Sequence, residues 1–283
     1  MRSGQAGMNR SDLSALFDQL ALRGNQVVVH ASLSSFGNIE GGALAVCSTL
    51  LEAVGDSGTV MMPAFTCAET WPRPEPGQPR SRPVAFHADI SVSKEVGTIA
   101  EAFRRLPGVL RSSHPTHSFA AWGRHAREVL STQRDNNPFG PLKKINIMQG
   151  HVLLLGTSLQ SATILHVAEE RFGVPYLNRG TAVRLNAAGY DERVVLENLP
   201  GCSAAFIKLE DRLDPAKVKS APLARGTARK IAVRYLMQLA TAMLDRDPRA
   251  FVCDQPDCLN CAAKRAALAD IEPKTPPAGL STP

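Results

Sequence analysis

The chain has few aromatic side chains and no long apolar run. Its 283 residues include ten Phe, three Tyr and two Trp, 5% in all. Single-stranded nucleic acids stack on aromatic side chains, so this supply is poor for that role. No stretch approaches the roughly 20 apolar residues that span a bilayer. The polar N-terminus also lacks the apolar centre of a signal peptide. These absences predict a cytoplasmic protein that binds neither membranes nor nucleic acid.

The basic residues form no dense block either. Lys and Arg number 32 against 26 Asp and Glu, which gives a formal net charge of +6 and a pI near 9.1. Such a surplus attracts anionic partners through long-range electrostatics. A nucleic-acid surface would concentrate the basic residues on one element with aromatics between them, and here they are spread along the chain. We therefore expect a small-molecule partner. The oligomeric state stays open, a homodimer included.

No internal repeat of fixed period is present, which disfavours solenoid architectures. The length and a hydrophobic content of 44% suit one large α/β unit with a sizeable core. We expect a single domain over residues 1–272 and a flexible tail over 273–283, where Pro and small residues dominate. Closely spaced prolines predict a loop, and a candidate lid, over residues 69–83.

Strand and helix patterns alternate from Gln26 onward. Val27–His30 predicts a short buried strand, 43–54 an apolar helix and Thr59–Pro63 a second strand. This order indicates a parallel βαβ crossover. Residues 151–156 form the clearest buried strand, and apolar residues at helical spacing predict a helix from about 228 to 244. The sequence thus predicts an α/β fold.

The loop between the first strand and the first apolar helix, residues 32–42, is rich in Ser and Gly. Its hydroxyls and flexible backbone precede a helix N-terminus, where backbone N–H groups attract anions. In a parallel βαβ unit this loop lies at the carboxyl edge of the sheet, where such proteins bind ligands. It is a candidate anion site, and the alternative is an ordinary tight turn.

One segment carries the groups for acid–base chemistry. After the strand at 151–156, His166 is followed by Glu169 and Glu170. If the chain is helical there, residues three and four apart share a face, so either carboxylate can orient the imidazole. A histidine beside a carboxylate is the minimum requirement for general-base chemistry near neutral pH. The alternative is a packed histidine with solvated carboxylates and no chemical role.

Four segments, in this order along the chain, resemble the antibiotic acetyltransferases typified by aminoglycoside 3-N-acetyltransferase. They are 29–37 followed by Gly41 and Gly42, 58–66, 111–123, and 152–156 leading to 163–169. The resemblance covers most of the chain. It implies an α/β fold with a central mixed sheet flanked by helices. It also implies antibiotic resistance by transfer of an acetyl group from acetyl-CoA to the 3-amino group of an aminoglycoside.

The resemblance also implies which residues form the site. The family's catalytic histidine falls at His166. A family carboxylate farther along the chain falls at Glu197, which is the preferred partner of that histidine, with Glu169 as the rival. Direct transfer is expected, because no Cys or Ser lies in a nucleophile motif. The positions that would hold the pyrophosphate and pantetheine arm of CoA fall at Ser32, Leu33, Ser34, Ser35, Gly37, Ile39, Thr66, Ser118, Phe119 and Ala120.

The sequence departs from the family pattern in ways that bear on the acceptor. Aminoglycosides are polycations and call for an acidic pocket, whereas this chain is basic. Asn38 stands where the family commonly has an aromatic residue, and Ala162 where it often has Asn. Two alternatives therefore remain: an acyltransferase for an anionic amino compound in natural-product biosynthesis, and a non-catalytic CoA-binding protein.

The cysteines near the C-terminus form a separate pattern. Cys253, Cys258 and Cys261 have the spacing C-x4-C-x2-C, which in a cytosolic protein indicates metal rather than disulfides. Tetrahedral zinc needs a fourth ligand, and Cys202 is the first candidate, with Asp254 or a histidine as alternatives. We expect a structural zinc that braces the segment after Glu197. The alternative is a set of reduced thiols.

Overall fold

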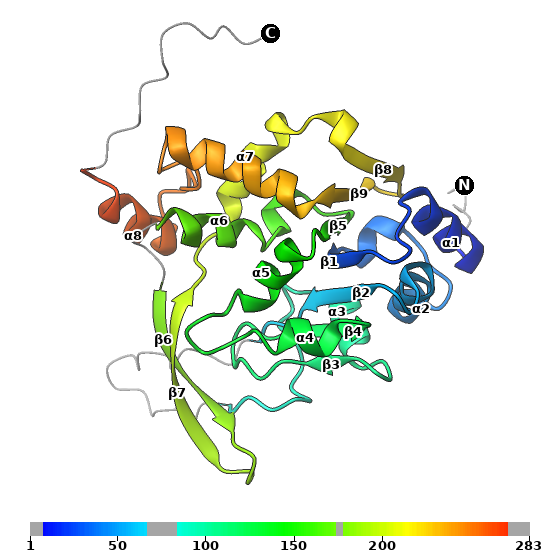
Figure 1. The fold of residues 1–283 in the computed structure, drawn as a ribbon, viewed down its shortest axis with the longest axis horizontal. Helices are drawn as coiled ribbons and strands as arrows, with labels where there is room; N and C mark the ends of the chain where they lie inside the picture. Colours follow the sequence, from blue (N-terminus) through cyan, green and yellow to red (C-terminus); the bar gives the residue numbers. More distant parts are fainter. Residues whose placement is uncertain (1–7, 67–83, 174–177, 271–283) are drawn as a thin grey trace, which may run out of the picture.

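The computed structural model of the protein describes residues 8–66, 84–173 and 178–270 (Figure 1). The candidate lid at 69–83 and the tail at 273–283 lie outside the described residues. Within the described ranges, no helix is both long and apolar enough to cross a lipid bilayer.

Seven strands of the described chain form one mixed sheet. Their bounds are β1 (Gln26–Ala31), β2 (Thr59–Pro63), β3 (Leu110–Arg111), β4 (Phe119–Gly123), β5 (His151–Leu155), β8 (Val218–Pro222) and β9 (Thr227–Ala232). The order across the sheet is β3-β4-β2-β1-β5-β9-β8. The central strands β2, β1 and β5 are parallel, and the pairs β2–β4, β3–β4, β5–β9 and β8–β9 are antiparallel. The predicted α/β fold with a mixed sheet is confirmed.

Helices cover both faces of this sheet (Figure 1). The α-helices are α1 (Arg10–Gln19), α2 (Gly42–Val54), α3 (Thr98–Arg104), α4 (Ala126–Leu130), α5 (Gly140–Ile147), α6 (Leu165–Phe172), α7 (Val233–Arg246) and α8 (Leu259–Ala267). Short 3₁₀ helices are η1 (Leu33–Phe36), η2 (Leu159–Ser161), η3 (Ala204–Arg212) and η4 (Pro215–Lys217). Strand, helix and strand in the order β1, α2, β2 form the predicted parallel crossover.

The two faces of β1 build two separate cores. Val27 and Val29 pack with residues of α1, α2 and α3, whereas Val28 packs on the other face with residues of α4, α5, α6 and α7. Successive side chains of a strand point to opposite faces. Because both faces of β1 are covered, its sequence is a continuous apolar run rather than an alternating one, as in other buried parallel strands.

A separate two-stranded sheet stands apart from the main one. Strands β6 (Asn178–Leu185) and β7 (Asp191–Leu199) form an antiparallel hairpin that extends at the lower left of Figure 1. The Arg184 guanidinium, on β6, lies 2.9 Å from an Asp135 carboxylate oxygen. The backbone N–H of Glu197, on β7, donates to the carbonyl of Asp135 at 3.0 Å. These contacts tie the hairpin to the loop before α5.

The predicted helix over about 228–244 is wrong in its first turn. Residues 227–232 are β9, which pairs antiparallel with β5, and the helix α7 begins at Val233. Ala228 and Ile231 are both fully buried but face opposite cores of the sheet. Two buried residues three apart imitate helical spacing, and a strand covered on both faces has no alternation to reveal it.

Candidate active site

A cavity of about 670 Å³ opens at the carboxyl ends of the three parallel strands. Its walls include the end of β1, the end of β2 with Phe65 and Thr66, and the segment that follows β5. This is the edge at which open α/β sheets bind ligands. Most of the polar wall is hydroxyl-bearing: Thr66, Ser93, Thr116, Thr157, Ser158, Ser161, Thr163 and Ser203.

Gly156, directly after β5, lets the loop 32–37 pack closely against this edge of the sheet. It has φ of 71°, a backbone conformation that favours glycine. A Cβ there would lie 2.1 Å from the Cβ of Ser35, so the end of β5 and the loop 32–37 are in close contact. The Ser35 hydroxyl donates to the Gly156 carbonyl at 3.0 Å. Only glycine allows this approach of strand and loop.

The cavity wall carries little charge. Burial lowers the pKa of His30 to about 4. Burial, with smaller effects from His114 and His166, lowers the pKa of His117 to about 3. Both rings are therefore neutral near pH 7. Among the described residues of the wall, Glu95 alone is formally charged.

His166 lies in the first turn of α6, directly behind the cavity wall. Its backbone N–H donates at 3.1 Å to the carbonyl of Thr163, which lines the cavity. The ring lies between two aromatic rings, with centroids 5.7 Å from Phe139 and 4.7 Å from Phe206. Because the imidazole is held between rings and is 4% exposed, its orientation is fixed by packing.

Glu169 lies three residues after His166 on the same helix face, as the sequence predicts for a helical segment. Its Oε2 accepts from Nδ1 of His166 at 2.6 Å, and its Oε1 accepts from Nζ of Lys264 at 2.8 Å. Burial acts to raise the pKa of this carboxyl. The hydrogen bond from His166 and the charges of His166 and Lys264 outweigh burial, so the pKa lies below its ordinary value.

This arrangement sets the chemistry of the ring. An ionised Glu169 only accepts hydrogen bonds, so Nδ1 of His166 carries the proton. Nε2 is then the ring nitrogen through which a proton can be exchanged with a substrate. The geometry is that of a general base oriented by a carboxylate.

Glu197, the carboxylate that the sequence resemblance preferred, lies elsewhere. It is on β7 of the hairpin, with its Oε1 2.8 Å from the guanidinium of Arg179. Its side chain is 35% exposed. The structure therefore brings Glu169, not Glu197, to His166. Local helical spacing identified the neighbouring carboxylate, whereas the resemblance pointed to a position on a different sheet.

The predicted CoA-binding residues fall into two groups. Thr66 lines the cavity, and the loop with Ser32, Leu33, Ser34, Ser35 and Gly37 continues from Ala31, which also lines it. Ile39 is bridged to Met8 beside the same loop. In contrast, Ser118, Phe119 and Ala120 are fully buried and are not part of the cavity wall. The Ser118 hydroxyl instead donates to the Ala64 carbonyl at 2.7 Å.

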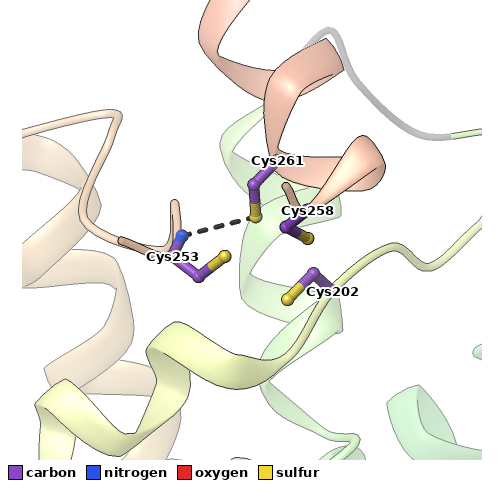
Figure 2. Close-up of side chains that lie close together, drawn as sticks. All are labelled: Cys202, Cys253, Cys258 and Cys261. Carbon is purple, nitrogen blue, oxygen red and sulfur yellow. Dashed lines mark hydrogen bonds between the residues drawn. The ribbon is translucent and has the colours of Figure 1, made fainter. Parts of the chain in front are cut away.

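The four predicted metal ligands converge (Figure 2). The sulfur atoms of Cys202, Cys253, Cys258 and Cys261 all lie within 4.8 Å of one another. Two sulfurs accept backbone hydrogen bonds at 3.3 Å, Cys261 from the N–H of Cys253 and Cys202 from the N–H of Ala204. The pKa of Cys258 is lowered to about 7, chiefly by the backbone N–H of Cys261. A hydrogen-bonded group of four thiols suits a tetrahedral metal ion.

Sequence reasoning missed two parts of the site. Lys264 lies on α8, far along the chain from Glu169, and no local pattern marks it as a partner. The hydroxyl-rich segment after β5, residues 157–161, holds none of the predicted site residues, because short polar segments are common in loops. A Ser- and Thr-rich stretch directly after a buried parallel strand is the signal that could have identified it.

Comparison with solved structures places the chain among the α/β acetyltransferases. The apoenzyme of aminoglycoside acetyltransferase AAC(3)-IVa shares 29% identity with a TM-score of 0.78, over 94% of this chain and 100% of that one. A histidine-to-alanine mutant of that enzyme in complex with a gentamicin has 28% identity and the same TM-score and coverage.

Sequence comparison agrees. The family model for aminoglycoside 3-N-acetyltransferase matches residues 28–245, and the chain belongs to this family. Aminoglycoside N(3)-acetyltransferase IV of Salmonella sp is 31% identical over 81% of this chain and 84% of its own length. The prophage-derived aminoglycoside N(3')-acetyltransferase-like protein YokD of Bacillus subtilis is 36% identical over 57% of this chain and 64% of its own length. The resemblance read from four segments is confirmed.

Proposed function

We propose that the protein transfers an acetyl group from acetyl-CoA to a primary amine of an aminoglycoside, at the 3-amino position, with His166 as the general base. One observation carries the proposal: the buried His166–Glu169 pair stands behind the wall of a cavity at the ligand-binding edge of the sheet. Family membership supports the reaction class. The gentamicin complex of the 28% identical relative supports the acceptor class.

The transfer proceeds directly from thioester to amine. Nε2 of His166 takes a proton from the ammonium, and the free amine attacks the thioester carbonyl. The new N–C bond forms, the C–S bond breaks, and the CoA thiolate takes the proton from His166, while the amide nitrogen releases one proton to water. Glu169 holds the ring and stabilises its imidazolium form, as a carboxylate does in hydrolase triads.

The cofactor is proposed to lie along the carboxyl edge of the sheet. The loop 32–37 offers backbone N–H groups and hydroxyls to the pyrophosphate, as loops before helix N-termini do. The hydroxyls of residues 157–161 line the cavity on the side of β5 and can donate to the oxyanion of the tetrahedral intermediate. Holding amine and thioester together supplies much of the remaining acceleration.

The test is release of CoA thiol from acetyl-CoA in the presence of 2-deoxystreptamine aminoglycosides. Wild type should release thiol, and His166→Ala should lose most of the roughly 100-fold to 10,000-fold that a general base typically contributes. His125→Ala is the matched control, because His125, the residue before α4, makes the same three-residue pair with Glu128 at 2.9 Å but is 29% exposed. Equal losses in both variants would remove His166 from the mechanism.

A second acceptor class is favoured by a different cavity. This cavity, of about 560 Å³, is lined by Arg111, Arg127, Arg134 and Arg184, with Asp135 as the acidic member of the wall. A cationic wall suits an anionic amino compound rather than a polycation. Thiol release with anionic amines alone would transfer the protein to that class. Binding of acetyl-CoA without thiol release, either with aminoglycosides or with anionic amines, would indicate a non-catalytic CoA-binding protein.

We also propose that Cys202, Cys253, Cys258 and Cys261 hold one structural zinc ion. Four thiolates about 2.3 Å from zinc place their sulfurs about 3.8 Å apart, which fits sulfurs that all lie within 4.8 Å of one another. Four protein ligands leave no open position, so the ion cross-links the chain and takes no part in the transfer. It would join the segment before η3 to the loop before α8 and to α8 itself.

Metal analysis of the purified protein tests the zinc proposal. We expect one zinc per chain, with Cys258→Ser losing most of it. Cys47→Ser is the control, because Cys47 is a buried thiol that donates to the carbonyl of Ile99 far from the cluster. If the wild-type protein, purified without chelator, is folded and contains no metal, the cluster is a set of reduced thiols.

A further inference from the structure

Lys264 is a fully buried lysine at the centre of the molecule's C-terminal contacts. Its side chain is 1% exposed. Its Nζ donates to Oε1 of Glu169 at 2.8 Å, to the carbonyl of Cys202 at 3.2 Å and to the carbonyl of Phe251 at 3.4 Å. Lysine is almost never fully buried unless it is paired. These three oxygens match the three N–H donors of an ammonium.

The same lysine is anchored to the cysteine cluster from two sides. It lies three residues after Cys261 on α8, so the two side chains share the buried face of that helix. The carbonyl that it contacts belongs to Cys202, a second member of the cluster. A metal held by these cysteines therefore fixes both the helix that carries Lys264 and one of the oxygens that orient its ammonium.

The ammonium of Lys264 also contacts the His166–Glu169 pair, through Glu169. One carboxylate oxygen of Glu169 accepts a hydrogen bond from Nδ1 and the other accepts one from Nζ. A carboxylate bound through both oxygens cannot rotate, so the direction of the imidazole depends on the position of Lys264. Partners behind a metal-bound or catalytic histidine commonly set its tautomer and orientation in this way.

We infer that Lys264 is a positioning residue that couples the four-cysteine site to the His166–Glu169 pair. The inference rests on the proposed roles of His166 as base and of the cluster as a metal site. Lys264 does not line the cavity at the edge of the sheet. It acts by holding the Glu169 carboxylate against Nδ1 of His166, and the cluster holds Lys264.

Other charged groups near the pair belong to different contacts. Glu170, next on α6, has its Oε1 2.7 Å from Nζ of Lys143 on α5. His117, from the segment before β4, is neutral near pH 7 because its pKa is about 3. Lys264 is thus a cation in direct contact with the carboxylate that accepts from Nδ1 of His166.

Steady-state kinetics of a double-mutant cycle test the inference. Lys264→Met should lower kcat by about 10-fold to 100-fold, a part of what a positioned general base contributes, with KM for acetyl-CoA unchanged. Lys264→Arg, which keeps the charge, should recover most of kcat. In a Glu169→Gln background, Lys264→Met should have no further effect, because the lysine acts only through that carboxylate. Losses that multiply in the double variant would overturn the inference.

The cycle also covers the risk that Lys264→Met fails to fold. Removing Lys264 alone takes a neutralising cation away from the buried Glu169 carboxylate, whereas the double variant removes both charges and escapes that cost. Lys208→Met is the matched control. Lys208 donates to the carbonyl of Val252 and to Asp254, beside the same cluster, but makes no contact with Glu169. It should leave kcat unchanged, and a loss equal to that of Lys264→Met would mean general loosening of the C-terminal segment.

A spectroscopic readout separates this inference from the proposed reaction. The His166 ring can be followed by NMR with labelled histidine, assigned with His166→Ala. Loss of the cation beside Glu169 strengthens proton binding by the His166–Glu169 pair, so the titration of the ring should move to higher pH in Lys264→Met. Cys258→Ser should move it in the same direction. An unchanged titration in Lys264→Met would refute the coupling even if no amine is acetylated.

Discussion

His166 and Glu169 face each other on α6, with 2.6 Å between Nδ1 and Oε2 and with both side chains buried. The two residues are three positions apart on the helix, so they share one face. Two aromatic rings hold the imidazole of His166 between them. A surface pair of the same spacing, His125 and Glu128, lacks this enclosure. Burial distinguishes this pair from the surface pair, because the ring cannot turn away and water does not screen the carboxylate.

Glu169→Gln should lower kcat by about 100-fold, with little change in KM for acetyl-CoA. The amide keeps the size of the carboxylate but loses the negative charge that stabilises the imidazolium. Its N–H₂ group can also donate to Nδ1 and hold the ring in the wrong tautomer. Steady-state kinetics with acetyl-CoA and an aminoglycoside measure the effect. Unchanged kcat would assign Glu169 a purely structural role.

Glu197→Gln should leave kcat within about twofold of wild type and cost little stability. Its carboxylate pairs with Arg179 on the hairpin, where the arginine side chain is 79% exposed. Exposed pairs of this kind contribute only about 0–1 kcal/mol. The same assay measures both glutamate variants side by side. A loss in Glu197→Gln as large as that in Glu169→Gln would restore the assignment suggested by the sequence resemblance.

The sequence predicted those parts of the site that depend on local geometry. The strand at 151–156 and the helix after Thr163 follow from periodicity over a few residues. Helical spacing made Glu169 one of two local candidates for the partner of His166, with Glu170 as the other. The family resemblance fixed the sheet type. It could not predict where the Glu197 side chain lies in space. The hairpin that carries this residue forms a separate sheet, and tertiary contacts decide how that sheet is oriented against the rest of the molecule.

Two features were beyond local patterns for physical reasons. Lys264 reaches Glu169 across 95 positions of sequence, and its burial depends on the contacts of α8. The strand β9 imitates the start of a helix in the sequence because both of its faces are buried, which removes the alternation that marks a strand. The cysteine cluster could be predicted from the sequence, because the spacing of cysteines indicates a metal site without knowledge of the fold.

The free energy of unfolding should fall as pH drops below about 6.5. His30 is a buried histidine whose pKa is about 4 in the folded chain, against 6.5 ordinarily. The unfolded chain therefore binds this proton more readily, and the stability present above pH 6.5 is lost progressively as pH falls to about 4. For one such group the full effect is on the order of 3 kcal/mol. His114, with a pKa of about 4, acts in the same direction.

Urea unfolding at several pH values between about 7.5 and about 4.5 measures this dependence. His30→Gln removes one titrating group and should flatten the fall in stability over that range. The control is His87→Gln, because His87 is exposed. If His30→Gln and wild type lose stability in parallel, His30 is not held neutral by the fold.

Gly156→Ala should destabilise the protein and weaken acetyl-CoA binding together. The substitution places a Cβ 2.1 Å from the Cβ of Ser35 and adds the strain of a positive φ. Either β5 or the loop 32–37 must shift, and that loop is the proposed seat of the CoA pyrophosphate. Overpacking and strain together should cost at least about 2 kcal/mol, with a higher KM for acetyl-CoA.

Gly189→Ala is the control that has the backbone strain of a positive φ without the steric clash. Gly189 has φ of 81° in the turn between β6 and β7, and no atom lies within 4 Å of its added Cβ. It should cost only about 1 to 2 kcal/mol and leave KM unchanged. Urea unfolding and the KM for acetyl-CoA are measured on both variants. If Gly156→Ala lowers stability without raising KM, the loop 32–37 is a structural turn and the pyrophosphate must bind elsewhere on the cavity wall.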